Sequence, residues 1–399
     1  MLHRSGRLEA LFTDYWSAGI WSPLARLLRA HRLASRTHEE LSDAEVYSFN
    51  ATALLEGIRQ RIQGRSNPYS GFLRIGSTFG RGVRKSLTRR RDQNWKNTIF
   101  FGYDTGFLEA AAWAKEQGAA TVVCQMDPSQ VEVEMVRAEE TKWPGWAKTP
   151  LLVPEEYFAW RKAEWALADL VMVNSKWTRD ALVKQGVSEK KIIIVPLAYE
   201  AEAELDVADK PRRADDAPLR VLYLGQVNLR KGIQYLVAAA RLLESVKDVP
   251  IKIDVVGPLA ISEHAIVTAP ANVRFHGAVS RDRVKDFYRE ADVFVLPTIS
   301  DGFALTQLEA MSYGLPVLTT PNCGDVVNDG VDGFITPARD AAALAKALQT
   351  LADDPERLQA MSDAARENVR RFSLDALDTN LRAVEQRLRP SEAPDLFTL

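Results

Sequence analysis

The sequence predicts an α/β protein of two domains, each a mainly parallel sheet covered by helices. Short apolar runs alternate with helical segments from residue 98 to residue 196, and a second such series begins at residue 220. This alternation is typical of parallel sheets, in which a helix connects successive strands. A chain of 399 residues can form two hydrophobic cores. Residues 200–218 are charged, rich in Ala and Pro and aperiodic, so we interpret them as the connection between the domains.

The first half of the chain contains six candidate strands and six candidate helices. Ser22 and Ser175 stand at helix starts as N-caps, and Gly186 ends the second of these helices. Residues 64–91 have only weak periodicity, and 79–91 fit either a solvated loop or a helix face. We expect strands at 8–14, 44–49, 98–103, 120–126, 170–174 and 192–196, and helices at 22–31, 51–62, 107–117, 131–140, 154–168 and 175–185.

The second half is organised around one segment, residues 298–316, which follows a buried strand at 292–297. Two acids in it, Asp301 and Glu309, enclose seven residues, and Gly314 and Pro316 end the helix between them. The apolar face of that helix is expected to carry Leu305, Leu308 and Met311. Further strands are expected at 220–224, 251–256, 273–275 and 315–320, and helices at 233–246, 280–290, 341–351, 355–371 and 374–388.

The spacing of these acids fits a nucleotide ligand. Open α/β sheets bind ligands at the carboxyl ends of their strands, where Asp301 lies. The amides of Ala304, Leu305 and Thr306 at the helix start suit a phosphate, and Glu309, one turn deeper, suits a ribose diol. Asp301 is then left for a sugar hydroxyl. The alternative is that both acids are solvated, with the helix dipole favouring the one near its N-terminus.

A second cluster, LYLGQVNLRKG at residues 222–232, places Arg230 and Lys231 just before a helix. Two cations there can hold a pyrophosphate and stabilise a departing nucleoside diphosphate. An isolated Arg-Lys pair is more often solvated surface. Because this pair is expected to lie opposite the acidic loop, binding of a phosphate is the better interpretation of the two cations.

The segment DGFALTQLEAMSYGLPV, residues 301–317, resembles the acid–seven–acid signature of the retaining family-4 glycosyltransferases, EGFGLxxLEAMAxGxPV. Asp301 replaces the usual Glu, and Ala304 replaces the usual Gly. The resemblance is dense from about residue 164 to residue 372 and thin before that. It implies the GT-B fold, in which two Rossmann-like α/β domains face a central cleft.

The resemblance also implies a division of labour along the chain. Residues 1–200 would form the acceptor-side domain, 201–373 the nucleotide-sugar domain, and 374–399 a helix that crosses back to the first domain. The implied reaction moves a sugar from a nucleotide-diphosphate donor to a hydroxyl of a glycan, polysaccharide or lipid-linked acceptor, with retention, without a metal and without a cofactor. We expect the catalytic set to be Arg230, Lys231, Asp301 and Glu309.

Individual site residues follow from the same resemblance. We expect Gly225, Gln226, Gly257, His276, Val279, Gly302, Phe303, Ala304, Leu305, Thr306 and Glu309 to bind the donor. Gln226 stands where the family usually has Arg, and His276 can equally be a structural histidine. Met126 stands where the family often has a His that contacts the donor sugar. Asp104, Gln125 and Asp127 are therefore the acceptor-side candidates.

The start of the chain departs from the family pattern of strand, Gly-rich loop and helix. Residues 1–6 resemble the end of that first helix, and 8–14 the second strand, which would leave the opening strand and loop missing. Such a gap would leave ladder groups unpaired inside the sheet. The alternative makes 8–14 the first strand, 13–19 its loop and 22–31 the first helix.

Composition excludes several other classes of protein. The net charge of −2 gives no case for nucleic-acid binding, and the distant Cys124 and Cys323 predict no disulfide framework but a reducing cytoplasm. No D-x-D motif suggests a metal, and no run approaches the ~20 apolar residues of a membrane span. We expect a cytoplasmic protein that can bind peripherally at the inner face of the membrane. Its candidate contacts with anionic lipid are Arg81, Arg84, Lys85, Arg89, Arg90 and Arg91.

Three rival functions remain open at this point. A sugar-nucleotide epimerase and a phosphorylase-like enzyme share the implied fold. A partner subunit that binds the donor without catalysis is the third. An epimerase would need additional acid and base groups, which the sequence does not identify.

Overall fold

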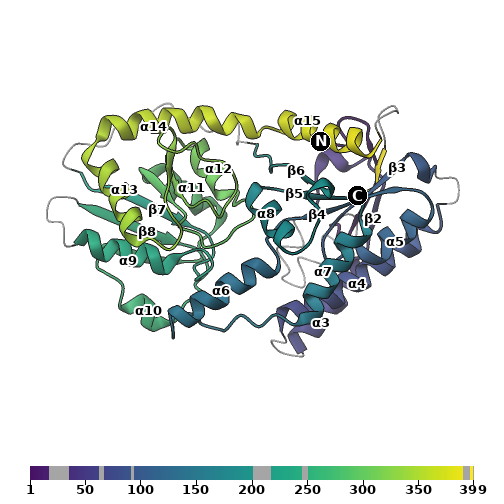
Figure 1. The fold of residues 1–399 in the computed structure, drawn as a ribbon, viewed down its shortest axis with the longest axis horizontal. Coiled ribbons are helices and arrows are strands. Elements are labelled where there is room, and N and C mark those ends of the chain that lie inside the picture. The colour runs from purple at the N-terminus through teal and green to yellow at the C-terminus, as the bar shows by residue number, and fades with distance from the viewer. Residues whose placement is uncertain are drawn as a thin grey trace.

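The computed structural model describes residues 1–17, 36–62, 67–90, 94–200, 217–244, 250–389 and 396–398. Two parallel sheets, each covered by helices, lie at opposite ends of the molecule (Figure 1). The helix expected at 22–31, most of the connection at 200–218 and Arg91 lie outside the described residues. Within them, no helix is both long and apolar enough to cross a membrane.

The first sheet has seven parallel strands in the order β2-β1-β13-β3-β4-β5-β6. The strands expected from the apolar runs of the first half are all present in it. They are β1 (Leu8–Thr13), β2 (Val46–Ser48), β3 (Thr98–Tyr103), β4 (Ala120–Gln125), β5 (Leu170–Val173) and β6 (Ile192–Ile194). The helices of this half are α3 (Asn50–Ile62), α4 (Pro68–Leu87), α5 (Leu108–Glu116), α6 (Gln130–Lys142), α7 (Glu155–Leu167) and α8 (Lys176–Lys184).

A strand from the other end of the chain, β13 (Leu396–Thr398), lies inside this sheet. It pairs in parallel with β1 on one side and with β3 on the other. Strand β1 is second from an edge of the sheet and is paired on both sides, with β2 and with β13. Without β13, the backbone N–H and C=O groups of β1 and β3 would face each other across a gap. They pair with β13 instead, because buried backbone groups need hydrogen-bond partners.

Helix α4 is a long helix, although the hydrophobic periodicity of residues 64–91 is too weak to predict one. Its buried face contains Gly71, Gly76 and Gly80 as well as Val83 and Leu87. A Cβ on Gly76 would lie 2.0 Å from the carbonyl oxygen of Thr105. The helix packs so closely against the loop before α5 that glycine is required, and a glycine face gives little hydrophobic signal.

The second sheet has six strands in the order β12-β11-β10-β7-β8-β9. They are β7 (Leu219–Leu224), β8 (Ile251–Val256), β9 (Val273–Gly277), β10 (Val293–Val295), β11 (Val317–Thr319) and β12 (Gly333–Ile335). The helices are α9 (Ile233–Glu244), α10 (Glu263–Val267), α11 (Arg281–Glu290), α12 (Thr306–Ser312), α13 (Ala341–Asp353) and α14 (Pro355–Asn368). The order reverses between β10 and β7, where ligands bind in doubly wound sheets.

Two helices connect the halves. Helix α15 (Leu374–Leu388) continues from α14 along one side of the molecule to the first sheet (Figure 1). There Arg7, which is 4% exposed, forms ion pairs with Asp378 and Glu385. Helix α6 extends in the opposite direction, toward α9 (Figure 1).

The buried carboxylate of Glu139 holds the far end of α6. It accepts hydrogen bonds from Gln234 Nε2 at 3.0 Å and from the Tyr235 hydroxyl at 2.9 Å. The following Trp146 belongs to the core of the second sheet. The two halves are thus linked by packed side chains as well as by the connecting segment.

Candidate functional site

The acidic loop lies at the carboxyl end of β10, buried among neighbouring loops. Ile299 donates its amide to the carbonyl of Arg230 at 2.8 Å, and Asp301 donates its amide to the carbonyl of Asn322 at 2.9 Å. Asp301 is 8% exposed. The loop is therefore held on one side by the Arg-Lys turn and on the other by the loop after β11, so its backbone has little freedom to move.

Helix α12 begins later than its apolar pattern predicts. It starts at Thr306, with Leu305 as a cap that is 40% exposed rather than on the buried face. Leu308 and Met311 are fully buried, as expected. In the described part of the chain, no protein acceptor is recorded for the amides of Ala304, Leu305 and Thr306. These three donors remain available to an anion.

Ala304 has φ of 60°, in the left-handed region. This conformation costs roughly 1–2 kcal/mol for a residue with a Cβ, which explains why glycine suits the position better. Phe303 is 2% exposed, its ring packs against Phe372, and its amide donates to Asp301 Oδ1 at 3.3 Å. Gly302 and Phe303 are thus buried, whereas Ala304 is half-buried at the start of the helix.

The Arg-Lys turn meets the acidic loop directly. The Lys231 ammonium forms an ion pair with Asp301, and Arg230 Nη1 lies 3.8 Å from the same carboxylate. Gly232 has φ of 76°, and a Cβ there would lie 1.7 Å from the carbonyl oxygen of Pro297, so only glycine fits. Burial and the neighbouring Arg230 lower the pKa of the Lys231 ammonium to about 8.

Gly225 and Gly257 close two adjacent strands with positive φ, and the amide of Gly225 donates to the carbonyl of Val256 at 3.0 Å. A Cβ on Gly257 would lie 1.9 Å from the carbonyl oxygen of Gly225. Gln226 is exposed beside them and its side-chain oxygen accepts from Asn228 Nδ2 at 3.1 Å. The structure brings these predicted residues to the same edge of the sheet as the Arg-Lys turn.

The remaining donor candidates have protein partners. Glu309 Oε2 accepts the hydroxyl of Tyr288 at 2.8 Å, and the Tyr288 ring stacks on Tyr313. His276 Nε2 lies 2.5 Å from Asp254 Oδ1. Val279 is half-buried against the core below. His276 is thus a partnered side chain, as the structural alternative anticipates, whereas the Glu309 Oε1 has no recorded partner among the described residues.

The acceptor-side candidates gather around a residue that the sequence did not single out, Arg161. Its guanidinium is 2% exposed, pairs with Asp104, and lies 2.9 Å from Asp127 Oδ2. Gln125 is fully buried, and its Oε1 accepts from Arg161 Nη1 at 2.9 Å. Gln125 therefore does not face a ligand; it positions Arg161. The only sequence signal for Arg161 is its place on the buried face of the amphipathic helix α7.

A second missed residue, Glu132 of α6, reaches across to the loops of the second sheet. Its Oε2 accepts the Ser300 hydroxyl at 2.9 Å and lies 3.5 Å from Arg230 Nη1. Burial raises the pKa of this carboxyl and that of Asp127. Trp177 Nε1 donates to the same Ser300 hydroxyl at 3.1 Å. Nothing in the local sequence around Glu132 marks it, because its partners are 98 or more residues away.

Comparison with known proteins agrees with this geometry. Residues 206–368 match the family described as glycosyl transferases group 1. The match lies in the second half of the chain, which contains the acidic loop and the Arg-Lys turn. The whole fold, with 96% of this chain covered, resembles sucrose-phosphate synthase from Thermosynechococcus elongatus, with a TM-score of 0.61, 19% identity and 99% of that chain covered. The architecture is GT-B.

Other glycosyltransferases have similar folds or sequences. Anabaena HepE, solved with UDP and glucose, has a TM-score of 0.58 at 14% identity, with 95% of this chain and 99% of that chain covered. The D-inositol 3-phosphate glycosyltransferase of Xylanimonas cellulosilytica is 32% identical over 48% of this chain and 49% of its own length. That of Corynebacterium urealyticum is 29% identical over 57% and 59%. The chain thus spans about half the length of these relatives.

Proposed function

We propose that this chain is a retaining glycosyltransferase that moves a sugar from a nucleoside-diphosphate donor to an acceptor hydroxyl. The observation that carries the proposal is the convergence of Arg230 and Lys231 on Asp301, beside three backbone amides for which the described residues provide no recorded acceptor. Two cations and oriented amides stabilise the charge that develops on a departing diphosphate. The match of residues 206–368 to the family described as glycosyl transferases group 1 and the UDP complex of a protein with a similar fold support this proposal.

In this proposal each residue has a role that the contacts permit. Arg230, Lys231 and the amides of Leu305 and Thr306 hold the diphosphate. Glu309 holds the ribose diol, while Tyr288 orients its carboxylate through the hydrogen bond to Oε2. Asp301 and the backbone of 302–304 hold the sugar. The base lies near Val279 and His276, and no metal or cofactor takes part.

The first domain contributes the acceptor side. Asp104 and Asp127 are held by the same Arg161 guanidinium, which fixes both carboxylates in one orientation. We propose 1–200, 201–373 and 374–399 as the functional divisions of the chain, with the last segment tying the donor half to the acceptor half.

The test uses the full chain and a panel of nucleotide-sugars. A donor at about 100 times its dissociation constant raises unfolding stability by about 2.7 kcal/mol, which thermal shift detects. Release of free nucleoside diphosphate in the presence of that donor supports the transferase, and the anomeric configuration of a product by NMR tests retention. Binding without release would favour the non-catalytic partner subunit. Conversion of the donor sugar without release would favour the epimerase.

A peripheral membrane role is a further part of the proposal. Arg81, Arg84, Lys85 and Arg89 are exposed on or just after α4, whereas Arg90 lies 2.8 Å from Glu9 and 2.9 Å from Glu45. Arg90 is therefore neutralised and drops out of the predicted basic set. Each free cation near an anionic surface adds about 1 kcal/mol. Flotation with anionic liposomes at low salt, lost at high salt and with neutral lipid, is the expected result.

A further inference from the structure

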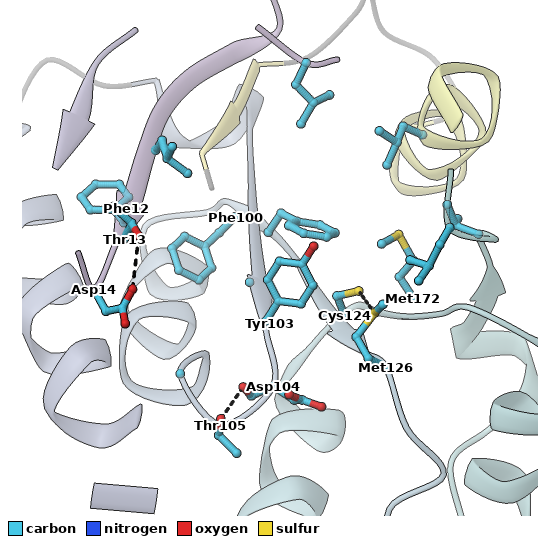
Figure 2. Close-up of a pocket in the computed structure, with 18 of the residues that line it drawn as sticks. Phe12, Thr13, Asp14, Phe100, Tyr103, Asp104, Thr105, Cys124, Met126 and Met172 are labelled. Atoms are coloured by element: carbon cyan, nitrogen blue, oxygen red, sulfur yellow. Dashed lines mark hydrogen bonds between the residues drawn. The ribbon is translucent and has the colours of Figure 1, made fainter. Parts of the chain in front are cut away.

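The first domain contains a cavity of about 800 Å³ at the carboxyl edge of its sheet. Ends of β1, β3, β4 and β5 line it, with α4 on one side and α15 on the other. Figure 2 shows the ring of Tyr103 between Phe100 and the sulfur atoms of Cys124 and Met126. Ligand sites are commonly about 300–1,000 Å³, so the cavity is of a size that proteins use for small molecules.

The side chains that line the cavity are largely apolar. Aliphatic side chains are the most numerous, and aromatic rings and sulfur-containing side chains such as Phe12, Phe101 and Met172 accompany them. Polar side chains lie toward the edge, where Figure 2 shows Asp14 on one side and Asp104 on another. A bare oligosaccharide would leave hydroxyl groups unpaired against such walls, which is unfavourable. An alkyl or prenyl chain would instead remove apolar surface from water.

One wall of the cavity touches the proposed donor loop. Met126 and Asn174 both line the cavity, and Asn174 Nδ2 donates to the carbonyl of Met126 at 2.9 Å. A Cβ on Gly302 would lie 1.9 Å from that carbonyl and 2.9 Å from Asn174 Nδ2. A ligand whose chain fills the cavity would therefore place its polar head beside the loop that contains Asp301.

Helix α4 links the cavity to the basic surface. Phe72, Ile75 and Phe79 face the cavity, and Phe72 remains 50% exposed. Arg81, Arg84 and Lys85 lie on the exposed face of the same helix. These three cations do not line the cavity, so they can attract an amphiphile to this side of the domain without holding it in the cavity.

From this arrangement, and resting on the function proposed above, we infer that the acceptor is an amphiphile with an aliphatic chain. The chain lies in the cavity between α4 and α15, and the hydroxyl that receives the sugar lies near Asn174 and Gly302. The proposal commits to a single-chain lipid-like acceptor rather than to a free sugar or a polysaccharide.

The test measures binding of a chain-bearing probe to the full protein without any nucleotide. The probe is 11-(dansylamino)undecanoic acid below its micelle concentration, and dansylglycine, with the same fluorophore and carboxylate but no long chain, is the control. We expect saturable fluorescence enhancement with the first and none with the second. Dodecyl maltoside should displace the probe, and maltose should not. Equal binding of both dansyl compounds overturns the inference.

Two exposed positions keep the test independent of folding. Tyr103 is 60% exposed and Phe72 is 50% exposed, so Tyr103→Asp and Phe72→Asp place a carboxylate in or beside the cavity without opening the core. Each should weaken probe binding at least tenfold, with an unchanged unfolding temperature. Leu55→Asp is the matched control, because Leu55 is 67% exposed on α3 and does not line the cavity.

The outcomes separate this inference from the proposed function. Unchanged probe affinity in both cavity variants overturns the inference, as does an equal loss in Arg84→Glu, which would place the probe on the basic surface. Probe binding in a protein that binds no nucleotide-sugar contradicts the proposed function and leaves the cavity site standing. Nucleotide-sugar hydrolysis in a protein that binds no probe supports the proposed function and overturns the inference of a chain-binding cavity.

Discussion

The two domains assemble their polar groups in different ways. In the second domain, the candidate residues come from short loops at one sheet edge, and each loop carries its own turn glycine or helix start. In the first domain, Asp104 and Asp127 come from two strand ends, and the Arg161 that pairs with both comes from a helix. Local motifs therefore mark the first kind of site, whereas the second kind depends on which helices pack together.

The largest expected effect is on the donor half. Lys231→Ala should lower turnover roughly 10²–10³-fold, the scale of losing one preorganised charge stabiliser. The reason is that Lys231 is the cation paired with Asp301 at the proposed phosphate position. Steady-state kinetics with the donor found by thermal shift measure the change.

The matched control is Lys252→Ala, because Lys252 is exposed on β8 away from the acidic loop. The control should have wild-type kinetics. Wild-type turnover in Lys231→Ala as well would remove this side chain from the proposed mechanism and leave the acidic loop without its nearest cation.

Next in size is the proposed ribose contact. Glu309→Ala should weaken nucleoside diphosphate binding by about 1.5–3 kcal/mol, the cost of a lost hydrogen bond to a charged group. Isothermal titration calorimetry measures the affinity directly. Tyr288→Phe removes only the hydrogen bond to Glu309 Oε2 and should cost much less. Unchanged affinity in Glu309→Ala would contradict the ribose assignment.

A pH effect of intermediate size follows from the buried ammonium. Because the pKa of Lys231 is lowered to about 8, its charge is largely present at pH 7 and largely lost at pH 9. Nucleoside diphosphate affinity should therefore fall roughly tenfold between those pH values, since only the charged form attracts the phosphate. Lys231→Arg keeps its charge across this range and should flatten the profile. A wild-type profile as flat as that of the variant would rule out Lys231 as the titrating group.

The smallest effect tests the contact between the halves. Glu132 lies 3.5 Å from Arg230 and competes with a phosphate for that guanidinium. Glu132→Gln removes the competing charge, and nucleoside diphosphate should bind roughly 2- to 5-fold more tightly, the range for a partly exposed ion pair worth up to about 1 kcal/mol.

Glu134→Gln on the same helix is the control, since Glu134 is exposed and faces Gln130 instead. Calorimetry at low salt gives the clearest difference, because salt screens the pair. Weaker nucleotide binding in Glu132→Gln would mean that this carboxylate helps to bind the donor rather than competing with it.

The sequence by itself determined the α/β class, the second βα series and the acid–seven–acid segment, because periodicity and turn glycines act over a few residues. It also located Arg230 and Lys231 opposite Asp301, since the carboxyl ends of parallel strands share one edge. The prediction that Leu305 lies on the apolar face of the helix is wrong, because α12 begins at Thr306 and Leu305 is its N-cap.

Only the tertiary structure decided the rest. In the folded protein β13 pairs between β1 and β3, and the glycine face of α4 packs against the loop before α5. The buried side chain of Gln125 is hydrogen-bonded to Arg161. The tertiary structure also brought Glu132 to Arg230 from 98 residues away and left an apolar cavity beside the acidic loop. These features depend on close packing and pairing between segments far apart in the chain, for which a local pattern contains no signal.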